Sequence, residues 1–222
     1  GLYFVIFGSM IGSRIGEIRP GIGYIDFLVP GLIMMSVITN SYGNISSSCF
    51  GAKFGCHVEE MLVSPMPGWV ILAGYVSGAV MRGLVVAMVV FAISLFFTKV
   101  QLHHPWVTLT TVLLTAIVFA LAGFVNAVFA RKFDDIALVP TFILTPLTYL
   151  GGVFYSTDAL PSPWREISHA NPILYMVNAF RYGLLGITDI SLWIAYAVMI
   201  GSVIVLGAFA LRLLHKGVGL RT

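Results

Sequence analysis

The chain has 222 residues, of which 59% are apolar and 9% are charged, with 12 basic and 9 acidic side chains. A soluble domain carries about 25% charged residues, so this chain has too few polar side chains to cover a globule of its size. The mean hydropathy of +0.98 agrees. The composition therefore excludes soluble enzymes, nucleic-acid binders and disordered linkers, and it predicts an integral membrane protein.

Clusters of charge divide the chain into apolar segments. A spanning helix needs about 20 mostly apolar residues, and these segments are continuous, unlike the alternating strands of a barrel. The opening segment is uncharged and has no basic start, so we interpret it as the end of a helix whose beginning is missing, rather than as a signal peptide. The sequence predicts a single all-α membrane domain over residues 1–222, with both termini on one side and six spans at about 1–12, 27–48, 69–97, 106–130, 136–154 and 190–211.

The second predicted span carries a polar stripe. Its polar and small residues recur at helical spacing, so they share a face about 100° wide. In lipid this face must turn toward protein or water, because unsatisfied polar groups are costly there. Helix packing through small residues and a substrate-facing or dimer-axis surface both explain it, and the two coincide if a pathway lies on a dimer axis. The candidate pathway-lining residues are Ser36, Thr39, Asn40, Gly43, Asn44 and Ser47.

The loop after the second span, residues 49–68, combines charges with apolar residues and two prolines. This pattern indicates a short amphipathic helix that ends before the third span. A solvated loop helix and a docking element for a soluble partner would both have this composition. Its candidate docking residues are Lys53, Glu59, Glu60, Met61, Leu62, Ser64 and Pro65.

The third span holds a charge. Arg82 lies well inside it, and an arginine at the centre of a spanning helix costs about 2.5–3.5 kcal/mol on insertion scales. Its guanidinium should therefore face a partner, a carbonyl or water, and no acid lies within another span to pair with it. A structural anchor and a function-linked role both remain open. Gly74 and Gly78 in the same span form a small-xxx-small pattern that favours close packing.

The fifth span repeats the polar theme. Pro140 and Pro146 each remove a backbone hydrogen bond, which predicts a kink or a broken turn. Kinked, threonine-lined helices often lie beside cavities. The second set of candidate pathway-lining residues, predicted to share one face, is Thr141, Thr145, Thr148 and Tyr149.

A long connection, residues 155–189, precedes the last span. Its segment 173–185 is apolar apart from Asn178 and Arg181, yet it is too short to cross a bilayer. Such a segment beside a span is typical of a re-entrant or interfacial helix. We therefore expect a helical hairpin that dips partway into the membrane.

Catalytic chemistry has little support in the sequence. The histidines lie in loops or the tail, the two cysteines are too few for a disulfide framework, and neither a Walker lysine motif nor HExxH is present. We expect no catalytic residue, no metal site and no nucleic-acid partner. Counting basic residues on the two sides of the membrane leaves the orientation undecided.

Several motifs in chain order resemble those of ABC-2 type permeases, closest to the drug- and nodulation-factor-exporting members. The resemblance covers nearly the whole chain. What departs is the start, because family members carry an amphipathic helix before the first span. The matching elements are 59–65 as an E-x-L-x-x-S/T-P element, 151–155 with Leu160, Pro161 and Trp164, Asn171-Pro172 with Tyr175 and 180–183, Lys53-Phe54, and 133–135.

The resemblance implies a half-transporter that dimerises in the bacterial inner membrane and binds two cytoplasmic ATPase subunits. ATP and Mg would be bound by those subunits, so the chain itself would hold no cofactor. It also implies that residues 49–68 and both termini are cytoplasmic. Lys53 and residues 59–65 would form the coupling helix, and the external gate would be formed by Asn171, Pro172, Tyr175 and Arg181.

Two other classes of protein remain as alternatives. An ion-coupled secondary transporter or channel would usually carry acids within its spans, and none of the nine acids here lies mid-span. A purely structural assembly subunit would need no polar stripe around Asn40. The mild polarity of that stripe argues against a small, highly charged substrate, and the sequence does not identify the substrate itself.

Overall fold

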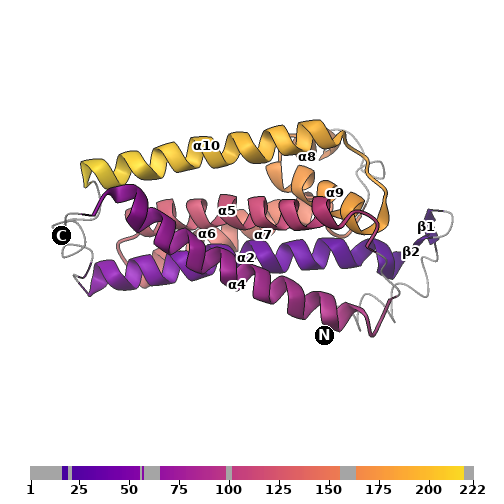
Figure 1. Ribbon diagram of the computed structural model, residues 1–222, viewed down its shortest axis with the longest axis horizontal. Helices are drawn as coiled ribbons and strands as arrows, with labels where there is room; N and C mark the ends of the chain where they lie inside the picture. Colours follow the sequence, from indigo (N-terminus) through magenta and orange to yellow (C-terminus); the bar gives the residue numbers. More distant parts are fainter. Residues whose placement is uncertain are drawn as a thin grey trace. The chain divides into compact units, whose positions relative to one another are not determined.

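The computed structural model describes residues 17–19, 22–55, 57, 66–98, 102–155 and 164–217. The regular structure of these residues is helical, apart from a short antiparallel pair in which Glu17 faces Gly23 and Arg19 faces Ile22. The elements in chain order are β1 (Glu17–Arg19), β2 (Ile22–Gly23), α2 (Tyr24–Phe54), α4 (Gly68–Ser94), α5 (Pro105–Phe129), α6 (Phe133–Val139), the π-helical turn η2 (Pro140–Leu144), α7 (Thr145–Leu150), α8 (Trp164–His169), α9 (Pro172–Leu185) and α10 (Leu192–Lys216) (Figure 1).

Five helical stretches of the described residues are long and apolar enough to cross a membrane. The second to sixth predicted spans are thereby confirmed as apolar helices of spanning length, although their ends differ from the prediction by a few residues. The first predicted span, 1–12, lies outside the described residues. The five stretches are Tyr24–Phe54, Gly68–Ser94, Pro105–Phe129, Phe133–Leu150 and Leu192–Lys216.

The chain divides into two compact units. Helices α2, α4, α5 and α10 each contribute residues to both of them. The first unit comprises Gly1–Ser36, Val85–Val112 and Leu147–Val198, and the second comprises Val37–Leu84, Leu113–Pro146 and Met199–Thr222.

Helix α9 is the most enclosed helix of the first unit, with ten of its 14 residues buried. Its start is fixed by Asn171, whose Oδ1 accepts a hydrogen bond from the Ile173 amide at 3.0 Å, and by Pro172 in the first turn. Gly186 ends it in the left-handed conformation at φ 73°, which glycine adopts without strain. At about 1.5 Å per residue, α9 is only about 21 Å long, so it is too short to cross a bilayer.

A turn at 170–171 joins α8 to α9, so this part of the long connection consists of two helices. We call these two helices the α8–α9 hairpin. That they form a re-entrant hairpin in the membrane stays a prediction.

The second unit has its own apolar core. At Gly123 the backbones of α2 and α5 approach closely, since a Cβ there would lie 2.6 Å from the Tyr42 carbonyl oxygen. The Ser46 hydroxyl uses this proximity and donates to the Gly123 carbonyl at 3.0 Å. The core draws on α2, α4, α5 and α10, with Ile45, Cys49, Phe50, Leu72, Ala79, Leu121, Phe124, Ala210, Leu213 and Leu214 among its buried members.

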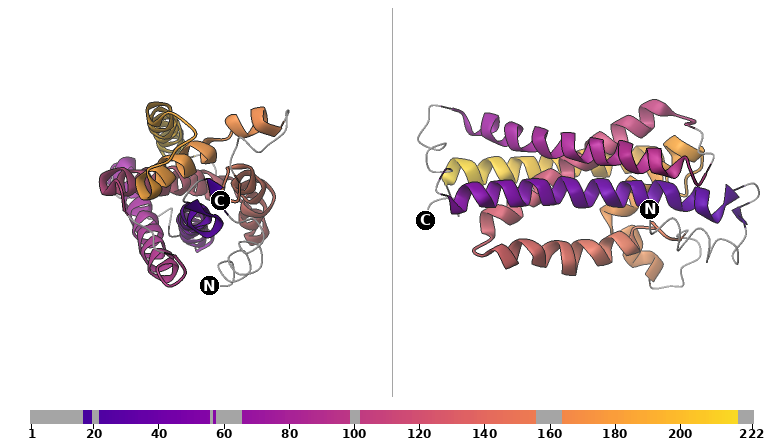
Figure 2. Two further views of the ribbon diagram at one scale, coloured as in Figure 1. Left: turned by 90° about the vertical axis from the view of Figure 1, so that its right-hand side faces the viewer. Right: turned by 90° about the horizontal axis from the view of Figure 1, so that it is seen from below.

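The fifth predicted span is one helical path interrupted by the π-helical turn η2 (Figure 2). Pro140 opens this turn, and because proline has no N–H, the Ile136 carbonyl lacks its usual helical donor. The Asn126 side chain of α5 supplies a replacement, with its Nδ2 donating to the Ile136 oxygen at 3.3 Å. The predicted break at Pro140 is confirmed.

Burial divides the second set of candidate pathway-lining residues. Thr141, Thr145 and Tyr149 are exposed, but Thr148 is buried. The role of these four residues in lining a pathway stays a prediction. The Thr145 hydroxyl meanwhile donates to the Pro140 carbonyl at 2.9 Å.

Candidate functional site

The polar stripe of α2 lies on the side that the described part of the chain leaves open. Buried and open residues alternate along α2 at helical spacing, so one side of the helix packs against its neighbours and the other does not. The buried set includes Ser41, Tyr42, Ile45, Ser46 and Cys49. The open set contains the predicted stripe, with Thr39 and Ser47 exposed and Ser36, Asn40, Gly43 and Asn44 partly exposed.

The stripe is only mildly polar, because serine hydroxyls in it bond to their own helix. Ser36 Oγ donates to the Leu32 carbonyl at 2.8 Å, and Ser47 Oγ donates to the Gly43 carbonyl at the same distance. Such back-bonding satisfies a hydroxyl without a partner from another helix. A Cβ at Gly43 would meet no atom within 4 Å, so the surface is open there.

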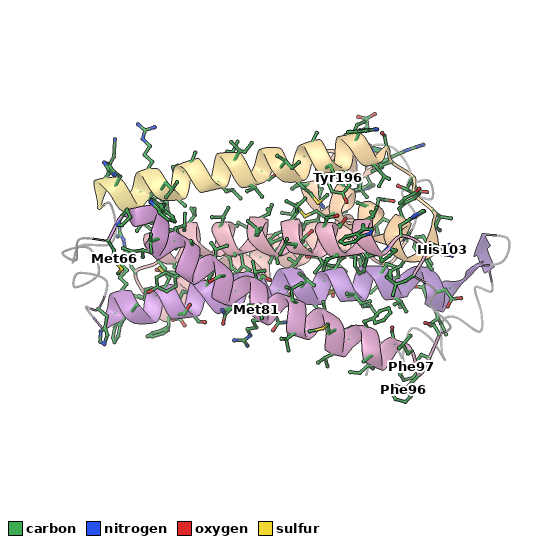
Figure 3. All side chains as sticks on the ribbon, in the orientation of Figure 1. Met66, Met81, Phe96, Phe97, His103 and Tyr196 are labelled. Carbon is green, nitrogen blue, oxygen red and sulfur yellow. The ribbon has the colours of Figure 1, made fainter. Side chains whose placement is uncertain are left out.

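A charge lies beside this stripe in the second unit. Arg82 projects from the middle of α4 and its Nη1 donates to Asn44 Oδ1 on α2 at 3.2 Å. The expectation that the guanidinium faces a partner is confirmed, and the partner is an amide. Arg82 is exposed, and so is its neighbour Met81, labelled in Figure 3. We call these two residues, Arg82 and Asn44, the Arg82–Asn44 pair.

The glycines of α4 do not pack within the described chain. A Cβ on Gly74 or Gly78 would meet nothing within 4 Å, so their small-xxx-small pattern leaves an open surface on α4. The close helix packing that this pattern favours is therefore absent at this position among the described residues.

Lys53 is held within the chain. Its Nζ donates to the carbonyls of Val128 and Ala130, each at 2.9 Å, at the end of α5. A lysine commonly satisfies the last carbonyls of its own helix, and here it does so for a neighbouring one. The other predicted coupling residues, Glu59, Glu60, Met61, Leu62, Ser64 and Pro65, lie outside the described residues.

An aromatic cluster adjoins Lys53. The Phe133 ring meets Phe50 edge to face at a centroid distance of 4.9 Å and lies 5.5 Å from Phe54. At the start of α6, the Asp135 carboxylate accepts from the Arg131 and Lys132 amides at 2.8 and 3.0 Å. Two sequence motifs, Lys53-Phe54 and 133–135, are thus brought together in space, which our sequence analysis missed. Each motif places a phenylalanine beside charges at the end of a span. This shared pattern was the sequence signal that could have indicated their proximity.

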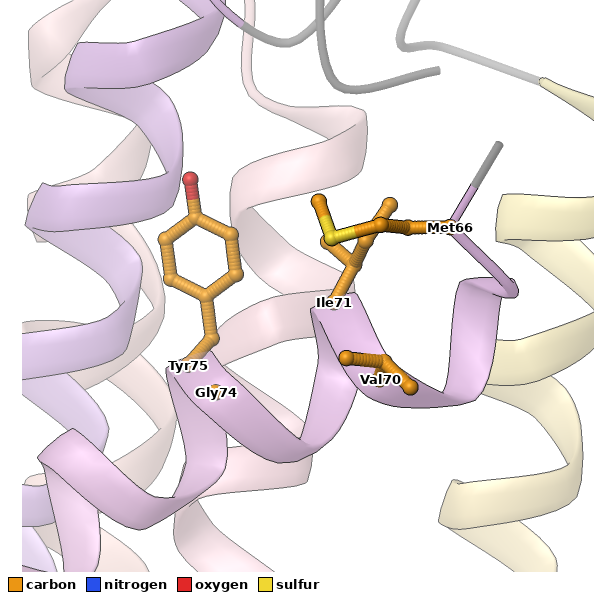
Figure 4. A pocket seen from close by; sticks show the side chains of 5 residues that line it. All are labelled: Met66, Val70, Ile71, Gly74 and Tyr75. Carbon is orange, nitrogen blue, oxygen red and sulfur yellow. The ribbon is translucent and has the colours of Figure 1, made fainter. Parts of the chain in front are cut away.

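An open apolar pocket of about 390 Å³ lies on the first turns of α4, just after residues 58–65 in the sequence. Tyr75 closes one side, with its ring 6.4 Å from that of Phe124. The pocket is lined by Met66, Val70, Ile71, Gly74 and Tyr75 (Figure 4).

Three of the predicted gate residues tie the first unit together. Asn171 Nδ2 donates to the Leu147 carbonyl of α7 at 2.6 Å, and the Tyr175 hydroxyl donates to the His169 carbonyl at 2.8 Å. They therefore anchor the α8–α9 hairpin, and Pro172 starts α9.

Arg181, the fourth predicted gate residue, is buried within the first unit. Its Nη2 donates to the Gly152 carbonyl at 2.8 Å, and its guanidinium carbon lies 3.8 Å from the centre of the Phe27 ring. This side chain therefore joins α9 to the start of α2 and to the turn after α7. Another inter-helix contact of this unit is a hydroxyl–hydroxyl hydrogen bond of 2.6 Å between Thr110 of α5 and Tyr196 of α10; Tyr196 is labelled in Figure 3.

Apolar helices of spanning length, one of them with a polar face, and a short enclosed helix ahead of the last span define a multi-pass membrane protein. Residues 1–185 match the family described as ABC-2 type transporter, and the chain belongs to this family. It is therefore the membrane component of an ABC transporter, and the ATP-binding subunit is a separate partner.

The chain is also similar to named proteins. The chain is 56% identical over 221 residues to the inner membrane transport permease YadH of Escherichia coli strain K12, covering 100% of this chain and 86% of the relative. It is 23% identical over 186 residues to nodulation protein J of Rhizobium leguminosarum bv. viciae, covering 83% of this chain and 71% of the relative. Nodulation protein J of Neorhizobium galegae is 23% identical over 195 residues, with 86% and 74% coverage.

Proposed function

We propose that the chain is the permease subunit of an ATP-driven exporter, in which two copies form the translocation pathway and two cytoplasmic ATPase subunits drive it. The proposed location is the inner membrane, as for the Escherichia coli relative, an inner membrane transport permease. Both termini and residues 49–68 are proposed to be cytoplasmic, and export is the direction that the resemblance of the sequence motifs implies.

The observation that carries this proposal is the open polar face of α2. One side of the helix is buried in the core, so the exposed Thr39 and Ser47 are not core residues. Lipid is a poor solvent for such a face. A second copy that covers α2 across a dimer axis would enclose the stripe and line a pathway with it.

Energy would enter through residues 59–65, since the permease needs a protein contact through which the ATPase can act on it. Lys53 supports this assignment indirectly. By bonding to the Val128 and Ala130 carbonyls, it ties the end of α2 to the end of α5, so a push on the adjoining loop would reach two helices. Lys53 is thus proposed to transmit force within the permease.

The α8–α9 hairpin is proposed to be the external gate. Its hydrogen bonds to Leu147 of α7, through Asn171, and to Gly152 in the turn after α7, through Arg181, would couple its position to that helix. A gate needs such a link so that it moves with the rest of the pathway.

Cysteine accessibility tests the pathway. In a Cys49→Ala, Cys56→Ser background, single cysteines at Thr39, Gly43 and Ser47 are compared with a control at Val205, an exposed apolar position of α10. The complex with its ATPase, in native membrane vesicles, is treated with a membrane-impermeant maleimide. A thiol in hydrocarbon does not ionise, and the thiolate is the reactive form.

The proposal predicts that the three α2 positions are labelled, that ATP changes their rates, and that Val205→Cys stays unreactive. Labelling at Val205→Cys as fast as on α2, or no labelling on α2 with or without ATP, would contradict it.

The alternative, an ion-coupled carrier or channel, has no supporting observation. Ion coupling usually relies on acids within the membrane. Between Asp26 and Asp134, which lie near helix starts, the sequence has only Glu59 and Glu60, and both precede α4.

A further inference from the structure

The Arg82–Asn44 pair puts a positive charge at mid-span. Arg82 is the fifteenth of the 27 residues of α4, and its Nη1 donates to the neutral amide of Asn44 at 3.2 Å. An amide oxygen orients a guanidinium but does not neutralise it. The pair therefore keeps a net positive charge, and both of its residues belong to the second unit.

The described residues leave the space beside the pair open. Gly78 lies one turn before Arg82 on α4, Gly43 directly precedes Asn44 on α2, and a Cβ at either glycine would meet no atom within 4 Å. Arg82 itself is exposed. A group of the size of a phosphate can therefore approach the guanidinium between these two glycine positions.

The sequence offers no mid-span acid to neutralise this charge. It has no Asp or Glu in residues 27–58 or 61–133; Asp26 and Asp134 lie near helix starts, and Glu59 and Glu60 precede α4 in the sequence. A second copy of the chain brings the same sequence and so adds no mid-span acid. Charged side chains within a membrane are usually paired or face a polar pathway, so the missing negative charge must come from another molecule.

We propose that the Arg82–Asn44 pair is a binding site for the anionic headgroup of a transported amphiphile, such as a phosphate monoester. This inference rests on the proposed pathway function of α2 and adds the substrate class to it. Arginine suits this role because its planar fork binds phosphate or carboxylate oxygens in pairs. The mildly polar stripe of α2 beside the pair would contact the rest of the amphiphilic molecule.

The experiment uses the complex of the chain with its ATPase in phosphatidylcholine nanodiscs. A lysophosphatidate that carries a diazirine on its acyl chain is the photolabel. Unlabelled lysophosphatidate, lysophosphatidylcholine of the same chain length and inorganic phosphate are the competitors. We expect lysophosphatidate to compete at least about tenfold better than the other two, which corresponds to one charge-assisted contact.

Two variants test the two residues of the site, and a third variant is the control. Arg82→Gln removes the charge and is expected to lower labelling about tenfold. Asn44→Asp leaves Arg82 in place but supplies an internal carboxylate at the same position, so it is expected to lower labelling to a similar degree. Arg212→Gln, at an exposed arginine of α10 in the same unit, is expected to label like the unchanged chain. Because Asn44→Asp keeps the arginine, the test does not depend on whether Arg82→Gln folds.

Equal labelling of Asn44→Asp and the unchanged chain would overturn the inference, and so would equal competition by lysophosphatidate and lysophosphatidylcholine. Competition by inorganic phosphate as strong as by lysophosphatidate would replace the amphiphile with a free anion and likewise overturn it. Photolabelling does not require ATP turnover. Loss of ATPase co-purification in the same samples would therefore contradict the proposed function separately, without changing the result for the site.

Discussion

Arg181 is a buried cation that joins several elements of the first unit. Arg181 combines a 2.8 Å hydrogen bond to the Gly152 carbonyl with a face-on contact to the Phe27 ring at 3.8 Å. A desolvated cation–π contact is worth about 2 kcal/mol, and a hydrogen bond from a charged donor is worth about 1.5–3 kcal/mol. The sequence analysis placed this arginine in the external gate, and the structure adds that it anchors α9.

Arg181→Ala is predicted to lower the free energy of unfolding by about 4 kcal/mol, because it removes both contacts. Arg181→Lys keeps the charge without the planar fork, so its free energy of unfolding should lie between those of Arg181→Ala and the unchanged chain. Denaturant titration in detergent micelles measures this, with the exposed Arg212→Ala as control. Equal stability of Arg181→Ala and Arg212→Ala would show that Arg181 is not an anchor.

Lys53 offers a second test at this scale. Lys53→Met is predicted to lower the free energy of unfolding of the isolated permease by about 1–2 kcal/mol, because the Val128 and Ala130 carbonyls lose their donor. Lys53→Arg can still donate to both and should retain most of the stability. The same denaturant titration applies, without the ATPase. If Lys53→Met leaves the stability of the isolated permease unchanged but the ATPase no longer co-purifies with it, Lys53 would instead be a direct contact to the ATPase.

Among the elements, helix existence and the polar face of α2 were predictable from sequence, but helix ends were not. The second span was predicted to end at residue 48, yet α2 continues to Phe54. The prediction took Lys53 as a loop charge, while the structure satisfies its ammonium with carbonyls of α5, a contact between residues far apart in the chain. Similarly, the prolines predicted a break in the fifth span but not that it is a π-helical turn, and the burial of Thr148 was not predicted either.

The π-helical turn makes a prediction at this scale. Asn126→Leu should destabilise the protein by about 1–2 kcal/mol, because the Ile136 carbonyl loses the donor that replaces the missing N–H of Pro140. In a Pro140→Ala background the new amide can donate to Ile136 instead, so the same Asn126→Leu change should cost much less. A double-mutant cycle in detergent measures the coupling. Additive effects would mean that Asn126 does not compensate for the proline.

For the whole molecule, composition and motif order were enough to predict a multi-pass ABC-2 type transporter component, and the family match confirms it. Which surfaces stay open was not predictable. The stripe was identified from its spacing, but the contact between Asn44 and Arg82 joins helices whose faces no single-sequence pattern aligns. Likewise, the glycines of α4 predicted packing, while the described chain leaves Gly74 and Gly78 open.

The central claim is that this chain moves its substrate only when a separate ATPase acts on it. The direct measurement is the ATP hydrolysis rate of the co-purified ATPase in proteoliposomes, with the unchanged chain, with Glu59→Lys or Glu60→Lys, and with Arg212→Gln as control. The unchanged chain and the control should raise the rate above that of the ATPase alone, and the two charge reversals should return it to that value while membrane insertion stays normal. Normal ATPase co-purification and stimulation by both charge-reversed chains would contradict the coupling assignment. Transport by the purified chain alone, driven by an ion gradient, would contradict the account as a whole.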